Sequence, residues 1–140
     1  MLQLKPYSAL FLTLEGFLIM TMGAYFVFLR PPLLPEDLRH IGLSLPAIQN
    51  SIPNLLDWMQ KVFWVMGGFI FTTGLITVFV AQTVFRLRTD KAFVLVLIAG
   101  ITSVGSMTII NFILDSDFKW VLSAFTLPWI ISLILYRLNK

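Results

Sequence analysis

Long apolar blocks alternate with short polar stretches along this 140-residue chain. Four such blocks stand out, over residues 8–29, 62–84, 92–114 and 120–136. Their lengths match the roughly 17 to 25 residues that a helix needs to cross the hydrocarbon core of a bilayer. None of them alternates polar and apolar residues as the strands of a membrane barrel do. The pattern therefore predicts an all-α integral membrane protein whose four long helices form a transmembrane bundle.

Residues 30–61 separate the first two blocks, and the first half of this outer loop has the pattern of a short helix. Pro35 suits the first helical position, two acidic residues follow it, and Gly42 can end the helix. Apolar residues recur there at helical spacing: Leu34, Leu38, Ile41 and Leu45. We expect a short amphipathic helix that lies on the outer membrane face or covers the bundle as a lid.

Two further local signals concern the long helices themselves. Asn50 or Ser51 can cap a helix, and Asp57 and Lys61 have the spacing of an ion pair within it. We expect this helix to continue directly into the second apolar block. Pro128 lies inside the fourth block, where it should kink the helix because it lacks a backbone N–H.

The composition agrees with a membrane protein. Hydrophobic residues make up 58% of the chain and charged residues only 12%, whereas soluble domains carry about 25% charged residues. We expect a single membrane domain over residues 1–140. The chain has no cysteine, which excludes disulfides and thiolate chemistry. Its N-terminus is basic and then apolar, as in a signal peptide, but the apolar run is longer, and we expect a retained span.

Basic residues are distributed unequally between the two sides that four alternating spans would create. One side carries six basic residues and the acid Asp90: Lys5, Arg86, Arg88, Lys91, Arg137 and Lys140. The other side carries four basic residues, Arg30, Arg39, Lys61 and Lys119, and five acidic ones, Glu36, Asp37, Asp57, Asp115 and Asp117. The positive-inside rule then places both termini in the cytoplasm, and we expect the bacterial inner membrane as the location. The basic loop is too small to recognise nucleic acid, so we expect membrane lipids as its partners.

Small residues recur on particular faces of the predicted spans. They are Gly67, Gly68, Thr72 and Gly74 in the second span, and Gly16 and Gly23 in the first. Small residues allow helices to approach closely in lipid, where the hydrophobic effect does not drive helix association. The pattern indicates packing within one bundle. The alternative is a homodimer, or a contact with a partner membrane protein, through the four small residues of the second span.

Glu15 is an acidic residue inside an otherwise apolar span, about 10 Å from the inner end of its helix. A carboxylate at such depth costs several kcal/mol unless it faces protein, water or a partner. Residues expected at its level include hydroxyls and an indole but no base: Thr77, Ala99, Ser103, Trp129 and Ser132. We therefore expect a neutral carboxyl that is hydrogen-bonded to the hydroxyls or to the Trp129 indole. The group is either a proton or ligand site or a structural link between helices.

A second polar group lies at the predicted outer mouth and consists of Glu36, Asp37, His40, Asn111, Asp115 and Asp117. Glu36 and His40 are four residues apart, a spacing that metal ligands use on helices. Two ligands do not complete a site, so we expect neither a metal nor a cofactor. The sequence also offers no nucleophile for His40 to activate and no phosphate-binding or hydrolase motif.

In layout, the loop helix LRHIGL followed by VFWVMGGFIFTTGL resembles small four-helix bacterial membrane proteins of the DoxX-like kind over most of the chain. Four short spans with one glutamate in the first are also similar to small multidrug resistance transporters, which implies proton-coupled transport through Glu15. The residues themselves favour a binding or accessory module for a lipid, a small apolar ligand or a partner membrane protein. A proton-coupled transporter is the alternative, and a membrane enzyme is the least favoured class.

Overall fold

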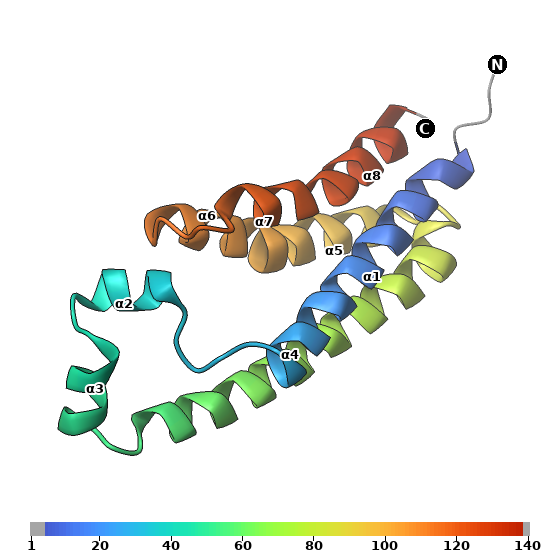
Figure 1. Ribbon diagram of the computed structural model, residues 1–140. Helices are drawn as coiled ribbons and strands as arrows, with labels where there is room; N and C mark the ends of the chain where they lie inside the picture. Colours follow the sequence, from blue (N-terminus) through green and yellow to red (C-terminus); the bar gives the residue numbers. More distant parts are fainter. Residues whose placement is uncertain (1–4, 139–140) are drawn as a thin grey trace.

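The computed structural model describes residues 5–138, and within that range it omits the side chains of residues 5, 6 and 90. Every element in this range is helical, and turns connect the helices (Figure 1). The elements are α1 (Lys5–Phe28), α2 (Pro35–Ile41), α3 (Leu45–Ser51), α4 (Leu55–Val80), the π-helical turn η1 (Ala81–Phe85), α5 (Asp90–Gly100), the π-helical turn η2 (Ile101–Gly105), α6 (Ser106–Ile113), α7 (Lys119–Phe125) and α8 (Leu127–Leu138). Four stretches are long and apolar enough to cross a membrane: Tyr7–Phe28, Leu55–Phe85, Lys91–Ile113 and Lys119–Leu138. The predicted all-helical chain with four such helices is confirmed.

Three of the four long helices are irregular, and the second of them ends in the π-helical turn η1. The third contains η2, around which the hydroxyls of Ser103 and Thr102 both donate to the Ala99 carbonyl oxygen. The fourth is divided at Thr126 into α7 and α8, and Pro128 lies in the first turn of α8, where its missing N–H costs little. The kink predicted from Pro128 is therefore present as a break between two helices.

The long helices form two pairs that meet mainly at one end (Figure 1). In one pair α1 packs along α4, and in the other α5 and α6 lie beside α8 and α7. The pairs are joined by the contact of α1 with α8 and by η1, which touches both α1 and α5. Helix α5 packs on α8 and on η1 and does not run along α4. The bundle is consequently closed at the end where α1 begins and α8 ends, and more open beyond it.

The contact between α1 and α4 depends on two opposed pairs of glycines. A Cβ atom added to Gly16 would lie 2.9 Å from the Gly74 carbonyl oxygen, and one added to Gly23 would lie 2.7 Å from that of Gly67. Both distances are too short for real contacts, so the two backbones touch directly. Glycines spaced seven apart on each helix therefore pack within the chain. Gly68 lies elsewhere: a Cβ there would meet nothing within 4 Å, and Thr72 is also exposed.

An aromatic core joins the two helical pairs at the closed end. The Tyr136 ring of α8 lies against Phe85 of η1 and Phe93 of α5, with ring centroids 4.5 and 5.4 Å apart. The Tyr136 hydroxyl donates a hydrogen bond of 2.9 Å to the Thr89 carbonyl oxygen in the turn before α5. Aromatic rings bury large apolar areas, so this cluster adds to the contact of α1 with α8 in joining the pairs.

The outer loop contains two short helices instead of the single one predicted. Helix α2 spans Pro35–Ile41 and is capped by Gly42, so it starts and stops where the sequence indicated, and Gly42 takes the left-handed conformation with φ of 76°. Ser44 then caps α3, and its side chain accepts a bond from the Ala47 N–H. The prediction that Asn50 or Ser51 caps the next helix is wrong, because both residues belong to the end of α3 and α4 begins only at Leu55.

Arg30 attaches the start of this loop to α4 and α2. Its guanidinium lies 3.6 Å from the centroid of the Phe63 ring and 3.3 Å from an Asp37 carboxylate oxygen. The Gln60 side chain also donates to the Arg30 carbonyl oxygen at 3.4 Å. The ring and the carboxylate both attract the positive charge of the guanidinium. These contacts fix Arg30, and with it the direction in which the loop leaves α1.

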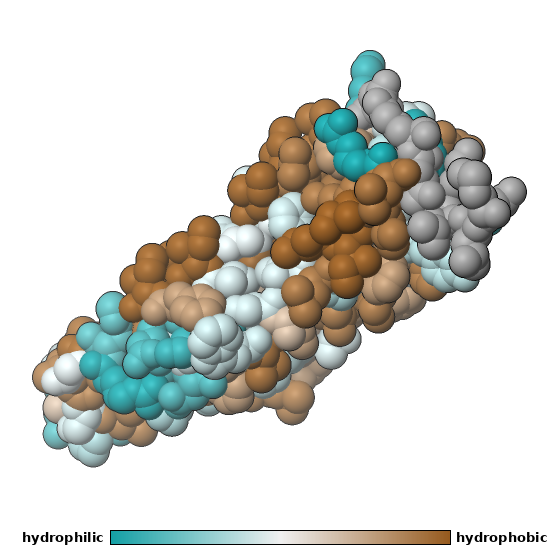
Figure 2. Space-filling model, turned by 90° about the horizontal axis from the view of Figure 1, so that it is seen from above, coloured by the Kyte–Doolittle hydropathy of each residue, from teal (hydrophilic) through white to brown (hydrophobic). Residues whose placement is uncertain are grey.

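The outer surface of the long helices is strongly apolar. Figure 2 shows polar residues gathered toward the two ends of the face in view, with apolar and near-neutral residues between them. Large exposed side chains include Phe69, Phe79, Ile109 and Trp120. Contiguous apolar surface of this extent is unfavourable in water, and it is the surface that four membrane-spanning helices require.

The glycine contact predicts opposite outcomes for two neighbouring substitutions in α4. Gly67→Ala places a methyl group 2.8 Å from the Gly23 carbonyl oxygen, so α1 and α4 must separate, and we expect a loss of about 1–3 kcal/mol in unfolding free energy. Gly68→Ala is the matched control, because its methyl group meets nothing within 4 Å, and we expect a change within about 0.5 kcal/mol. Reversible denaturant unfolding in mixed micelles measures both. Equal effects of the two substitutions would contradict this packing.

Candidate functional site

A buried carboxyl group in the middle of α1 marks the candidate site. Glu15 is 1% exposed, although it neighbours Gly16, which faces α4. Neither Glu15 carboxyl oxygen has a hydrogen-bond partner among the described residues. A buried polar group without a partner loses its solvation and gains nothing in return, which costs about 1–3 kcal/mol or more. Such a group calls for an explanation outside the stability of the fold.

Glu15 borders a cavity of about 160 Å³ that lies between α1, α4, α5, η2 and α8. Most of its wall is aliphatic and comes from residues such as Leu12, Ile19 and Val104. The other groups that were expected at the level of Glu15 also line it, with one exception: Thr77, Ala99, Ser103 and Trp129 are present. The structure therefore brings four of these five residues to the same cavity as Glu15.

The expected hydrogen bonds to Glu15 do not form, because each neighbouring hydroxyl is used by its own helix. Thr77 donates to the Thr73 carbonyl oxygen at 2.8 Å, and Ser103 donates to that of Ala99 at 2.6 Å. Thr73, which also lines the cavity, donates to the Phe69 carbonyl oxygen at 2.8 Å. A hydroxyl on a helix can always reach the carbonyl four residues before it, and this local bond needs no partner from another helix.

Ser132 is the exception, since it lies outside the cavity. Its hydroxyl donates a bond of 2.8 Å to the Ser8 carbonyl oxygen, and both residues are buried. Ser8 precedes Glu15 by seven residues on α1, so Ser132 lies nearer the closed end than the depth estimate from the sequence placed it. The residue links α8 to α1 structurally.

Trp129 closes one side of the cavity from the start of α8. Its indole N–H donates to the Val96 carbonyl oxygen of α5 at 3.0 Å and is not available to Glu15. A Cβ added to Gly100 would lie 2.0 Å from the indole Nε1 atom, so this glycine makes the space for the ring. Sequence reasoning did not select Gly100, although a glycine within an apolar span was the available signal. The backbone N–H of Trp129 lies near the Glu15 carboxyl without forming a hydrogen bond of ordinary geometry.

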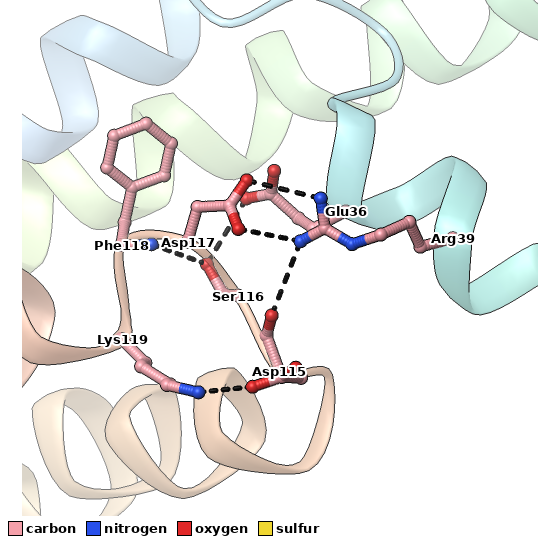
Figure 3. Close-up of polar contacts among 7 residues, drawn as sticks. All are labelled: Glu36, Arg39, Asp115, Ser116, Asp117, Phe118 and Lys119. Atoms are coloured by element: carbon pink, nitrogen blue, oxygen red, sulfur yellow. Dashed lines mark hydrogen bonds and ion pairs between the residues drawn. The ribbon is translucent and has the colours of Figure 1, made fainter.

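The outer polar group is a joint between α2 and the loop that connects α6 with α7 (Figure 3). The Arg39 guanidinium binds the Asp117 carboxylate at 2.7 and 3.3 Å, and it also faces the Asp115 carbonyl oxygen. Glu36 is only 4% exposed and accepts a bond of 3.2 Å from the Ser116 hydroxyl. The sequence selected Glu36, Asp115 and Asp117, but it missed Arg39 and Ser116, which bring them together.

The pKa values of two residues at this joint move in the directions that ion pairing produces. The Asp117 carboxylate raises the pKa of Arg39, and hydrogen bonding to Lys119 lowers the pKa of Asp115. A depressed carboxyl pKa adds stability above the value of the unfolded chain, and this contribution disappears as the pH falls through the folded value. Arg39, Asp117 and Asp115 are exposed to solvent and Lys119 is half-buried, so the pairs fix the position of α2 more than they stabilise the fold.

The remaining predicted members of the outer group lie apart from this joint. Asp37 accepts from the Leu34 N–H at 2.8 Å and pairs with Arg30, Asn111 donates to the Met107 carbonyl oxygen of its own helix, and His40 is exposed. Within residues 5–138, no three carboxylate or imidazole side chains are grouped closely enough to hold a metal ion. The cavity at Glu15 is consequently the stronger candidate for a functional site.

Comparisons with protein-family models, with curated proteins and with solved structures find no match to this chain. The resemblances to DoxX-like proteins and to small multidrug resistance transporters therefore stay predictions from the sequence. The chemistry of the cavity is what remains to indicate a function.

The two buried carboxyl groups predict stability changes of opposite sign. Glu15→Leu removes an unpartnered polar group of similar size, so we expect no loss and up to about 2 kcal/mol of added unfolding free energy. Glu36→Leu leaves the Ser116 hydroxyl without its acceptor, and we expect a loss of about 1 kcal/mol. Unfolding in mixed micelles compares the two variants with the parent. A large loss for Glu15→Leu would show that the group links helices structurally.

Proposed function

We propose that this chain is an integral membrane protein that binds a small, mostly apolar molecule in the cavity beside Glu15. Support comes from four helices of sufficient length, from the apolar outer surface, and from a cavity whose wall is largely aliphatic. The observation that carries the proposal is a buried carboxyl without a partner at the edge of that cavity. Ionisable groups in membrane-spanning helices are costly, and those that are retained mark functional sites.

The size and position of the cavity suit a ligand that arrives from the lipid. An engineered apolar cavity of about 150 Å³ binds benzene, and the cavity here is of similar volume, at about 160 Å³. It lies where α5 does not pack along α4, and its wall there includes Ile76 and Leu95, which are exposed. A molecule dissolved in the bilayer can enter between these two helices without crossing the closed end.

A proton-coupled transporter is the second candidate. A carboxyl without a protein partner can release its proton when a ligand arrives and recover it when the ligand leaves. Transport also needs a second route out of the cavity, whereas the wall between α4 and α5 suggests one opening. Binding is therefore the better supported function.

We further propose the bacterial inner membrane as the location, with both termini in the cytoplasm. The start of α1 and the end of α8 lie at the same end of the molecule as the turn that carries Arg86 and Arg88 (Figure 1). Lys140 and the side chains of Lys5 and Asp90, which the charge comparison includes, lie outside the described residues. Alkaline phosphatase fused after Lys140 should be inactive in a bacterial host, and strong activity would reverse the orientation.

Toluene tests the cavity directly. We expect it to shift the methyl NMR signal of Ile19, which lines the cavity, because an apolar cavity of this size accepts a benzene ring. Ala99→Leu should abolish the shift by filling the space, since Ala99 also lines the cavity. Ala124→Leu makes the same change at an exposed position on α7 and should leave the shift intact. A toluene-dependent shift of equal size in all three proteins would place the binding elsewhere, and no shift in the parent would remove the proposal.

A further inference from the structure

The polar side chains beside Glu15 in the cavity can accept hydrogen bonds from a ligand, but their own protons are already donated elsewhere. The hydroxyl protons of Thr73, Thr77 and Ser103 are all donated to carbonyl oxygens of their own helices. The indole proton of Trp129 is donated to the Val96 carbonyl oxygen. Hydroxyl oxygens keep lone pairs after donating, so these side chains can still accept bonds.

Among the residues that line the cavity, the carboxyl of Glu15 is the only ionisable group. The nearby backbone N–H of Trp129 is directed at that carboxyl, so it is not a donor for a ligand. The described basic side chains lie at the two ends of the helices, as with Arg30 and Lys119 at one end and Arg86 and Lys91 at the other. A positive charge opposite Glu15 can therefore come only from a bound molecule.

We propose that the ligand of this cavity is a small primary amine with an apolar body, whose ammonium group pairs with the Glu15 carboxylate. The inference rests on the proposed binding function and adds the chemical class of the ligand. An ammonium group has three donors and no acceptor, which is the complement of a wall that offers acceptors. It also compensates the charge of a carboxylate that no protein group compensates.

The proton balance of binding is simple when the amine arrives neutral from the lipid. The Glu15 O–H bond breaks as an N–H bond forms on the amine, so one carboxylic acid and one amine become one carboxylate and one ammonium. The net charge of the cavity stays at zero, and no side chain beyond Glu15 changes its protonation. The resulting pair lies in an environment of low dielectric constant, where attraction between opposite charges is strong.

The volume of the cavity limits the apolar body to about the size of one benzene ring. Benzylamine, benzyl alcohol and toluene share that ring and differ only in the attached group. We would measure their binding to the parent protein in phosphatidylcholine nanodiscs through the Ile19 methyl signal, and correct each concentration for partition into empty nanodiscs. Benzylamine should bind about tenfold or more tightly than either neutral compound, as a charge-assisted hydrogen bond requires.

Two substitutions show whether that preference comes from Glu15. Glu15→Gln should abolish the preference for benzylamine and leave toluene binding in place. Glu36→Gln neutralises the other buried carboxylate, which does not line the cavity, and should leave the preference unchanged. Toluene binding without a preference for benzylamine, or a preference that survives Glu15→Gln, would overturn the amine proposal while the binding function stands. Failure of all three compounds to bind would overturn both proposals.

Discussion

The direct backbone contact between α1 and α4 is the constraint on which the rest of the structure depends. Two pairs of opposed glycines, Gly16 with Gly74 and Gly23 with Gly67, bring the helices closer than any side chain would allow. In a lipid environment the hydrophobic effect does not hold helices together, so close packing has to do so. This fixed pair sets the direction in which every other face of α1 points.

Glu15 is placed by that contact. Because Gly16 faces α4, the preceding residue is turned toward the space shared with α5 and α8. The second helical pair reaches α1 through α8, and at the closed end Tyr136 of α8 packs against Phe85 of η1 and against Phe93 of its own pair. The space beyond this attachment remains unfilled, and Glu15 lies at its edge. A cavity and a carboxyl without a partner thus have the same origin in the way the pairs meet.

A polar connection lies at the end opposite the aromatic core, where the loop of residues 30–61 reaches the second helical pair. Arg30 fixes the start of the loop against Phe63, and Arg39 fixes α2 against Asp117. The two contacts differ in kind, because Arg30 is nearly buried whereas the Arg39 pair is exposed. Exposed ion pairs contribute little free energy. This polar connection therefore fixes the position of the loop, while the aromatic core and the contact of α1 with α8 hold the two helical pairs together.

The sequence by itself determined the helical class, the number of long apolar helices and the start and end of α2, since these follow from local pattern at Pro35 and Gly42. It also brought Thr77, Ala99, Ser103 and Trp129 to the level of Glu15, because depth along a helix follows from counting residues. Only the tertiary structure decided that the neighbouring hydroxyls serve their own helices, as Thr77 does, and leave Glu15 without a partner. Whether a hydroxyl bonds to a carbonyl of its own helix or to a side chain on another helix depends on the distances between helices. The contact of Arg39 with Asp117, 78 positions apart in the chain, depends on such distances as well. No local pattern contains such distances, because they arise only when the helices pack.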